Sequence, residues 1–315
     1  MKKLIIILAA LTLALLFCFS AAASSLQVSV VPSDALWVLH LDIEKYASSE
    51  LYKLLADKEG AAGINQKAGE LFGKFKIEPF TDLKGITIYG RGKGEEDAVV
   101  AVSGNFDKPH LLGLIKAEAT TKELPYGKYT LYNWDKSDFG VFATDSLILL
   151  AEQEGSIKLA LDALDGKIGN ISSSPLMAQI KKESAEAMVV GAASDISSLA
   201  GEDEKSALLG KIRAASCSIA EKGDAFNLKI DIGADSAQTA KEMEQAIRGL
   251  IAIGNLQLAE TTEVKTLLQN INLALDGEKV RIALSYPIAK LAEMLKGLGS
   301  LPHASIGKVL PHSLN

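Results

Sequence analysis

Alternating apolar and polar residues along the first half of the chain predict strands, and apolar residues three or four positions apart predict helices. Asp42 and Asp107 each precede a helical segment and are expected to cap it, because a side-chain carboxylate there accepts a free backbone N–H. The expected strands are 35–42, 85–89, 98–103, 129–134, 139–143 and 147–151, and the expected helices are 43–57, 61–76, 107–117 and 155–164.

The second half repeats this kind of alternation after a polar connector and a short helix that ends near Glu183. Its long helix has an apolar stripe formed by Ala240, Met243, Ile247, Leu250 and Ile251. Asp276-Gly277 is expected to form a type I′ turn between the last two strands. The expected strands are 188–194, 214–221, 225–232, 271–275 and 279–285, and the expected helices are 196–211, 236–253, 263–269 and 288–298.

Both halves therefore predict the same order of elements, a strand and helix followed by two hairpins that each precede a helix. We interpret this order as an internal duplication of a β-α-hairpin-α-hairpin-α unit. The expected fold class is α+β, with mainly antiparallel sheets that are each covered on one face by helices. The expected organisation is a signal peptide over 1–23, a first unit over 24–169, a second unit over 170–300 and a flexible tail over 301–315.

The N-terminus has the pattern of a cleavable export signal. Lys2 and Lys3 precede an apolar run from Leu4 to Phe19, and small residues follow it, with Ala21 and Ala23 at the positions that a signal peptidase reads. A membrane-spanning helix needs about 20 apolar residues, and this run is shorter. We therefore expect a periplasmic or secreted protein that keeps no stable membrane span after cleavage. An uncleaved anchor is the alternative.

Charge and cysteine content narrow the classes of function further. Without Lys2 and Lys3 the chain keeps 31 basic and 39 acidic residues, a net charge of about −8. Such a surface repels nucleic acid, so no nucleic-acid partner is expected. Cys18 leaves with the signal peptide and Cys217 remains alone, so an intramolecular disulfide is excluded. Stability must then come from a packed core, for which about 290 residues suffice.

Two segments resemble parts of exported bacterial proteins of unknown function that are built from duplicated α+β units behind a signal peptide. They are VVPSDALWVLHLDIEKY, residues 30–46, and FGVFATDSLILLAEQEGSIKLALDAL, residues 139–164. The resemblance extends over most of the mature chain as a pattern and includes no specific motif. It implies the fold and the export, and it implies no activity.

Reactive residues are scattered and do not form a known catalytic motif. The glycines of 90–94 are followed by three carboxylates and a strand, which favours a hairpin turn over a phosphate-binding loop. Cys217 lies within a strand, where a cysteine usually fills the core. The four histidines, His40, His110, His303 and His312, lack the spacing of zinc ligands. We expect no enzyme activity, no cofactor and no metal site.

Aromatic residues provide the single candidate ligand-binding site. Tyr129, Tyr132 and Trp134 concentrate on one predicted strand, and alternation places Tyr132 and Trp134 on the same face. If that face is uncovered, it is a binding surface, because Tyr and Trp are enriched at interfaces. The alternative is that these rings pack beneath a helix.

Three functions follow as hypotheses. The leading one is a non-catalytic module of the cell envelope or periplasm that binds an envelope protein, a polymer or an apolar ligand through a sheet face. A periplasmic carrier of a lipid or other hydrophobic ligand is the second, and it requires an apolar cavity. An enzyme whose site gathers residues distant in sequence is the third, and it requires a pocket that joins His40 or His110 to carboxylates.

Overall fold

A computed structural model describes residues 26–56, 72–92, 97–135, 138–196, 210–257 and 262–299. The predicted signal peptide and the predicted C-terminal tail lie outside the described residues. Most of the helix expected over 61–76 and most of that expected over 196–211 do so as well.

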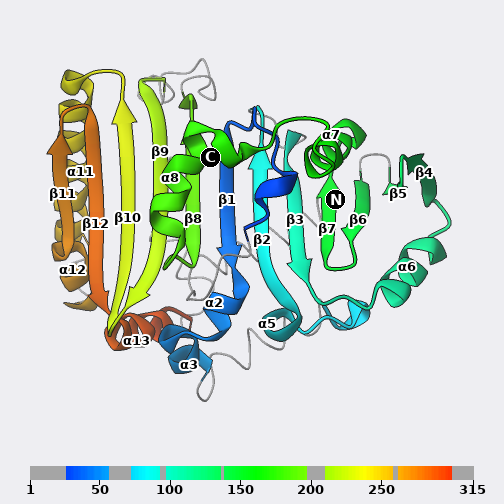
Figure 1. Ribbon diagram of the computed structural model, residues 1–315. Helices are drawn as coiled ribbons and strands as arrows, with labels where there is room; N and C mark the ends of the chain where they lie inside the picture. The colour runs from blue at the N-terminus through cyan, green and yellow to red at the C-terminus, as the bar shows by residue number, and fades with distance from the viewer. Residues whose placement is uncertain are drawn as a thin grey trace.

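The described strands form one antiparallel sheet of twelve strands (Figure 1). Its order is β11-β12-β10-β9-β8-β1-β2-β3-β7-β6-β5-β4. The strands are β1 (Trp37–Asp42), β2 (Leu83–Gly90), β3 (Val99–Gly104), β4 (Lys122–Tyr126), β5 (Tyr129–Asp135), β6 (Asp138–Thr144), β7 (Leu147–Ala151), β8 (Val189–Ser194), β9 (Ile212–Lys222), β10 (Ala225–Ala234), β11 (Ile271–Asp276) and β12 (Lys279–Pro287).

The two predicted units contribute to this sheet side by side. β1 of the first unit pairs with β8 of the second, so the two units share one continuous sheet, which the sequence pattern alone did not determine. Outward from this junction the first unit runs β1-β2-β3-β7-β6, and the second runs β8-β9-β10-β12-β11. The first unit adds β5 and β4 beyond that order. The duplication itself stays a prediction.

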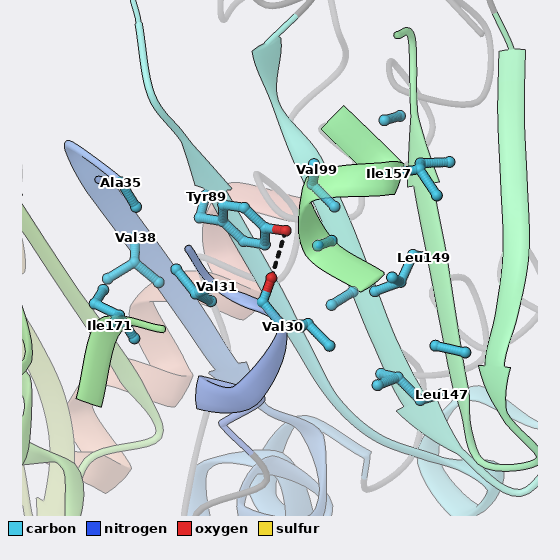
Figure 2. Close-up of a cluster of buried hydrophobic side chains, with 14 of the residues drawn as sticks. Val30, Val31, Ala35, Val38, Tyr89, Val99, Leu147, Leu149, Ile157 and Ile171 are labelled. Carbon is cyan, nitrogen blue, oxygen red and sulfur yellow. Dashed lines mark hydrogen bonds between the residues drawn. The ribbon is translucent and has the colours of Figure 1, made fainter. Parts of the chain in front are cut away.

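Helical segments and loops pack on both faces of the sheet, whereas the sequence pattern predicted cover on one face. The face that includes Val38 and Val190 is covered by η1 (Val28–Val30), α7 (Glu154–Leu164), η4 (Ile171–Ser173) and α8 (Pro175–Ser184). Figure 2 shows how η1 enters this core, where the Tyr89 hydroxyl donates to the Val30 carbonyl at 2.7 Å. We call this the front face.

The back face carries the side chains that alternate with these, including Leu41 and Val189. Because both faces of the central strands are covered, every residue of β3 is buried. The described helices that contribute to the back-face cores or lie beside them are α2 (Ile43–Ala47), α3 (Glu50–Ala56), η2 (Gly73–Phe75), α5 (Pro79–Asp82), α6 (Lys108–Ala117), α11 (Ala237–Gln257), α12 (Thr262–Gln269) and α13 (Ile288–Gly299).

The predicted helix caps are confirmed at two positions. The Asp42 carboxylate accepts from the backbone N–H of Lys45, and the Asp107 carboxylate accepts from that of His110. The helix expected over 43–57 is divided into α2 and α3 at Ser48 and Ser49. Pro79 begins the short helix α5, because its fixed φ suits a first turn.

The turn between β11 and β12 differs from the prediction. Asp276 pairs with Lys279, so the two central residues are Gly277 and Glu278. A type I′ turn needs positive φ at both central residues, but among these two only Gly277 has it, at +59°. Asp276 ends β11, and Gly277 next to it adopts the left-handed conformation.

Candidate functional site

The predicted aromatic site is divided between the two faces of the sheet. Tyr132 pairs with Gly140, and the Trp134 ring lies so close to Gly140 that an added Cβ would meet it at 2.8 Å. Tyr132 and Trp134 therefore share the back face, as predicted. The Tyr132 side chain is buried, and Lys116 of α6 lies 5.8 Å from its ring centroid. Tyr132 is thus buried with Lys116 from the last turn of α6 near its ring, and a ligand-binding role for these residues stays a prediction.

Tyr129 lies on the front face and belongs to a network of tyrosines, aspartates and lysines. Its hydroxyl donates to Asp165 at 2.8 Å, and Tyr126 donates to Asp162 at 2.7 Å. Lys167 bridges both aspartates, at 2.8 Å and 3.5 Å. Since both aspartates follow or end α7, these bonds fasten the β4–β5 hairpin to that helix.

The electrostatics of this network are those of a structural contact. Hydrogen bonds from Lys128 and Tyr129 lower the pKa of Asp165 to about 2. Burial and the bond to Asp165 raise the pKa of Tyr129. The carboxylate stays ionised and the phenol stays protonated at neutral pH, so neither group is prepared to accept or donate a proton there.

A second group of ionisable side chains lies inside the protein around β1. His40 is only 3% exposed, and its Nδ1 lies 3.0 Å from the Thr87 hydroxyl. Burial, with the nearby positive charge of Lys45 as a second cause, lowers the pKa of His40 to about 3. The imidazole is therefore neutral at physiological pH.

Asp42 and Lys45 complete this buried group, and their contacts are with the backbone. The Lys45 ammonium donates to the carbonyls of Ala185 and Ala187, at 3.0 and 3.2 Å, just after α8. It lies 3.9 Å from the Asp42 carboxylate, which caps α2. Burial lowers the pKa of Lys45, and Asp42 opposes that change. The three groups join β1, α2 and the end of α8.

The other candidate residues are placed apart. His110 is partly exposed on α6, and its Nε2 lies 3.1 Å from the Lys74 carbonyl. Burial raises the pKa of the Cys217 thiol, which makes it a poor nucleophile. His303 and His312 lie outside the described residues. Across the described ranges, no three His, Cys, Asp or Glu residues gather in a metal-binding arrangement.

The surface feature that sequence reasoning missed is an apolar stripe on α11. Leu250, Ile253 and Leu256 are 68%, 51% and 80% exposed, and Leu275 on the neighbouring β11 is 45% exposed. The sequence pattern placed Leu250 on the inward face. In the structure Ala240 and Met243 are buried there, whereas Leu250 is turned away from the sheet. We call Leu250, Ile253 and Leu256 the α11 stripe.

Charge is absent from the part of α11 that carries this stripe. Residues 249–257, GLIAIGNLQ, contain no charged side chain, and Arg248 just before them pairs with Glu244. This uncharged run was the sequence signal that could have revealed the stripe. Scattered exposed apolar residues are ordinary on a protein surface, but a contiguous group marks a site of interaction.

The front face of β10 and β12 is the polar counterpart of this surface. Figure 1 shows α8 in front of β8 and β9 and no described helix in front of β10 and β12. Arg281 and Asp231 pair across these strands, with Nε and Oδ1 2.7 Å apart. This uncovered face is therefore polar, and the exposed apolar groups lie on the helix behind it.

No described helix combines the length and the apolar character that a membrane span requires. Neither a protein-family model nor a curated protein matches the chain. Among solved structures, crystal form III of TP0453 is similar, with a TM-score of 0.50, 12% identity and coverage of 89% of this chain and 100% of that chain. Crystal form I of TP0453 gives a TM-score of 0.49 at 11% identity, over 88% and 98%. At such identities the likeness shows the fold alone.

Proposed function

We propose that this protein is a non-catalytic binding module of the cell envelope, which holds a partner protein through the α11 stripe. The observation that carries the proposal is the concentration of exposed large apolar side chains on α11 and β11. Leu250, Ile253, Leu256 and Leu275 all lie on these two neighbouring elements. An apolar partner surface would remove them from water, at a gain of about 25 cal/mol per Å².

The envelope location rests on the sequence. Lys2, Lys3, the apolar run and the small residues up to Ala23 form an export signal, and the chain after Ala23 is acidic. Under this proposal cleavage releases a chain that begins at Ser24.

A non-catalytic role is supported by the ways in which the ionisable groups are used. His40, Asp42 and Lys45 are buried and bonded to Thr87 or to backbone groups, and Tyr129 and Asp165 bond to each other. Each of these contacts joins secondary-structure elements. Turnover by the pure protein that one side-chain substitution abolishes would refute the proposal in favour of the enzyme hypothesis.

The experiment compares the mature chain with two variants on beads exposed to a membrane-free envelope extract. Leu250→Glu combined with Ile253→Glu places charges within the α11 stripe, and Gln245→Glu adds one charge to an exposed position of the same helix as the control. We expect a retained protein to bind the mature chain and the control, and to lose at least tenfold in affinity for the double variant. Equal retention by all three would contradict the proposal.

The same samples test the lipid-carrier hypothesis. Organic extracts of the purified chain are examined by mass spectrometry for copurified lipid, and uncharged vesicles are tested for co-sedimentation. Stoichiometric lipid in the mature chain, lost in the double variant while no protein is retained, would replace the partner protein with a hydrophobic ligand.

A further inference from the structure

The two edges of the sheet differ in how far they resist pairing with another strand. β4 carries Lys122 and Pro125, and both residue types discourage the addition of a strand. β11 reads INLALD, has neither residue type, and pairs with β12 in an unbroken register. Figure 1 shows β11 at the end of the sheet, with α11 and α12 behind it and no described strand beyond it.

The hairpin register determines which backbone groups of β11 point outward. Asp276 and Lys279 close a two-residue turn and form a hydrogen-bonded pair, so alternate residues back along β11 bond to β12. The N–H and C=O groups of Ile271, Leu273 and Leu275 therefore point away from the sheet. Consistent with this direction, the Leu273 carbonyl accepts from Arg248 of α11 rather than from β12.

We propose that this edge pairs with the same strand of a second copy of this chain, antiparallel about a two-fold axis at Leu273. In this register Leu273 faces its own copy, and Ile271 faces Leu275. About six backbone hydrogen bonds form, two for each facing pair. The side chains match as well, because these apolar residues meet on the back face.

The polar side of the strand is also self-complementary. On the front face Asn272 lies opposite Ala274 of the copy, and Asn270 lies opposite Asp276, so an amide donor meets a carboxylate and no like charges meet. The cation that reaches this edge, Arg248, is neutralised by Glu244. The Leu273 carbonyl has two lone pairs, so it can accept a hydrogen bond from Arg248 and another from the second copy.

Symmetry and the nature of the other edge limit the assembly to two chains. A two-fold contact uses the same surface on both copies and is closed. The edges left after pairing are both β4, where Lys122 and Pro125 oppose further addition. The product is one continuous sheet across two chains, and the α11 stripe has no part in the strand pairing.

The first test is the mass of the mature chain in solution by light scattering over a range of concentrations. We expect about twice the chain mass, with dissociation on dilution. Leu275→Pro removes one outward N–H from each copy, and the loss of two backbone hydrogen bonds should raise the dissociation constant roughly thirtyfold. Leu275→Ala keeps the amide and should weaken the dimer by less.

The second test reads the register with cysteines. Asn272→Cys combined with Ala274→Cys places sulfur-bearing residues opposite each other at a pair spacing of about 4.5 Å, within the disulfide range. Mild oxidation should link nearly all of the double variant into dimers, whereas each single variant should stay unlinked. The single variants also control for Cys217.

Three outcomes would overturn the proposal. These are a monomer at every concentration tested, equal dissociation of Leu275→Pro and Leu275→Ala, or equal cross-linking of the single and double cysteine variants. Loss of the dimer in the Leu250→Glu and Ile253→Glu double variant would instead assign the contact to the α11 stripe, and the strand pairing would be wrong.

Discussion

The buried histidine makes a quantitative prediction about stability and pH. His40 is almost completely enclosed, contacts the Thr87 hydroxyl, and has a pKa of about 3 in the folded protein. In the unfolded chain an imidazole titrates near 6.5. Between these two values the unfolded state binds a proton that the folded state does not, so stability falls as the pH falls.

The magnitude follows from the difference between the two pKa values. About 3.5 pKa units at 1.36 kcal/mol per unit give about 4.8 kcal/mol when the whole range is crossed. Between pH 7 and pH 4 this single group should remove about 3 kcal/mol of unfolding free energy. Well above pH 6.5 both states are neutral, and the group has no effect on the pH dependence.

His40→Gln is the variant that isolates this contribution, because an amide can still bond to Thr87 and does not titrate. Urea unfolding is measured for the mature chain and the variant at pH 7, 6, 5 and 4. We expect the native chain to be the more stable at pH 7. The difference in unfolding free energy between the native chain and the variant should shrink by about 3 kcal/mol at pH 4, and it can change sign. Taking the difference between the two proteins cancels the titration of the carboxylates that they share.

His110→Gln on α6 is the matched control, because that imidazole is partly exposed. Its urea unfolding is measured at the same four pH values. If the His40→Gln difference were constant to within about 0.5 kcal/mol from pH 7 to pH 4, the claim of a neutral, enclosed imidazole would be wrong.

Three further changes have expected outcomes. Lys45→Met leaves the buried Asp42 carboxylate without its cation and should cost about 3 kcal/mol in urea unfolding; a cost below about 1 kcal/mol would contradict this role. Gly140→Ala places a Cβ 2.8 Å from the Trp134 ring, so it should lower the free energy of unfolding by about 1–3 kcal/mol and shift the tryptophan fluorescence. An unchanged spectrum would refute this expectation. Expression in a bacterial host should yield a protein whose N-terminal sequence begins at Ser24, and an intact Met1 in the exported fraction would overturn the cleavage prediction.

A control for the glycine substitution is available in α6. An added Cβ at Gly113 meets nothing within 4 Å, and the residue lies in a helix interior. Gly113→Ala should therefore raise the free energy of unfolding by about 0.5–1 kcal/mol, since alanine loses less backbone entropy. Opposite signs at the two glycines would show that the cost at Gly140 arises from its close neighbours, the Trp134 ring and the Leu150 side chain.

Every described strand except β4 overlaps an expected strand, because an apolar run or an alternation of apolar and polar residues marks it. β2, β3, β6 and β7 were expected close to their observed positions. β4 was missed because KELPY combines a lysine, a glutamate and a proline, a composition that opposes strand prediction. The same residues are suited to an edge, where one side of the strand needs no partner.

Contacts between distant residues could not be predicted from periodicity. Alternation showed that His40 faces away from Leu39 and Leu41, but its burial depends on tertiary packing, including the contacts that the segment from Leu26 to Val30 makes beside Thr87. Leu250 has the spacing of an inward residue and lies within the expected helix, yet it is 68% exposed, whereas Ala240 and Met243 are buried against the strands. A local sequence pattern shows which residues share one face of a helix. It does not show how much of that face the sheet covers.

The β4 and β11 ends of the sheet differ in whether their surface groups are already bonded within the chain. At the β4 end, Asp162 and Asp165 hold two tyrosines, three lysines surround them, and a proline interrupts the edge, so polar groups there are already bonded within the chain. At the β11 end, the Leu273 carbonyl accepts from Arg248, but the other outward backbone groups and the α11 stripe have no such partners among the described residues. Desolvating paired charges is costly, whereas desolvating apolar side chains and joining strand edges is favourable. Interaction with other molecules is therefore expected at the β11 end, whichever of its two surfaces is occupied first.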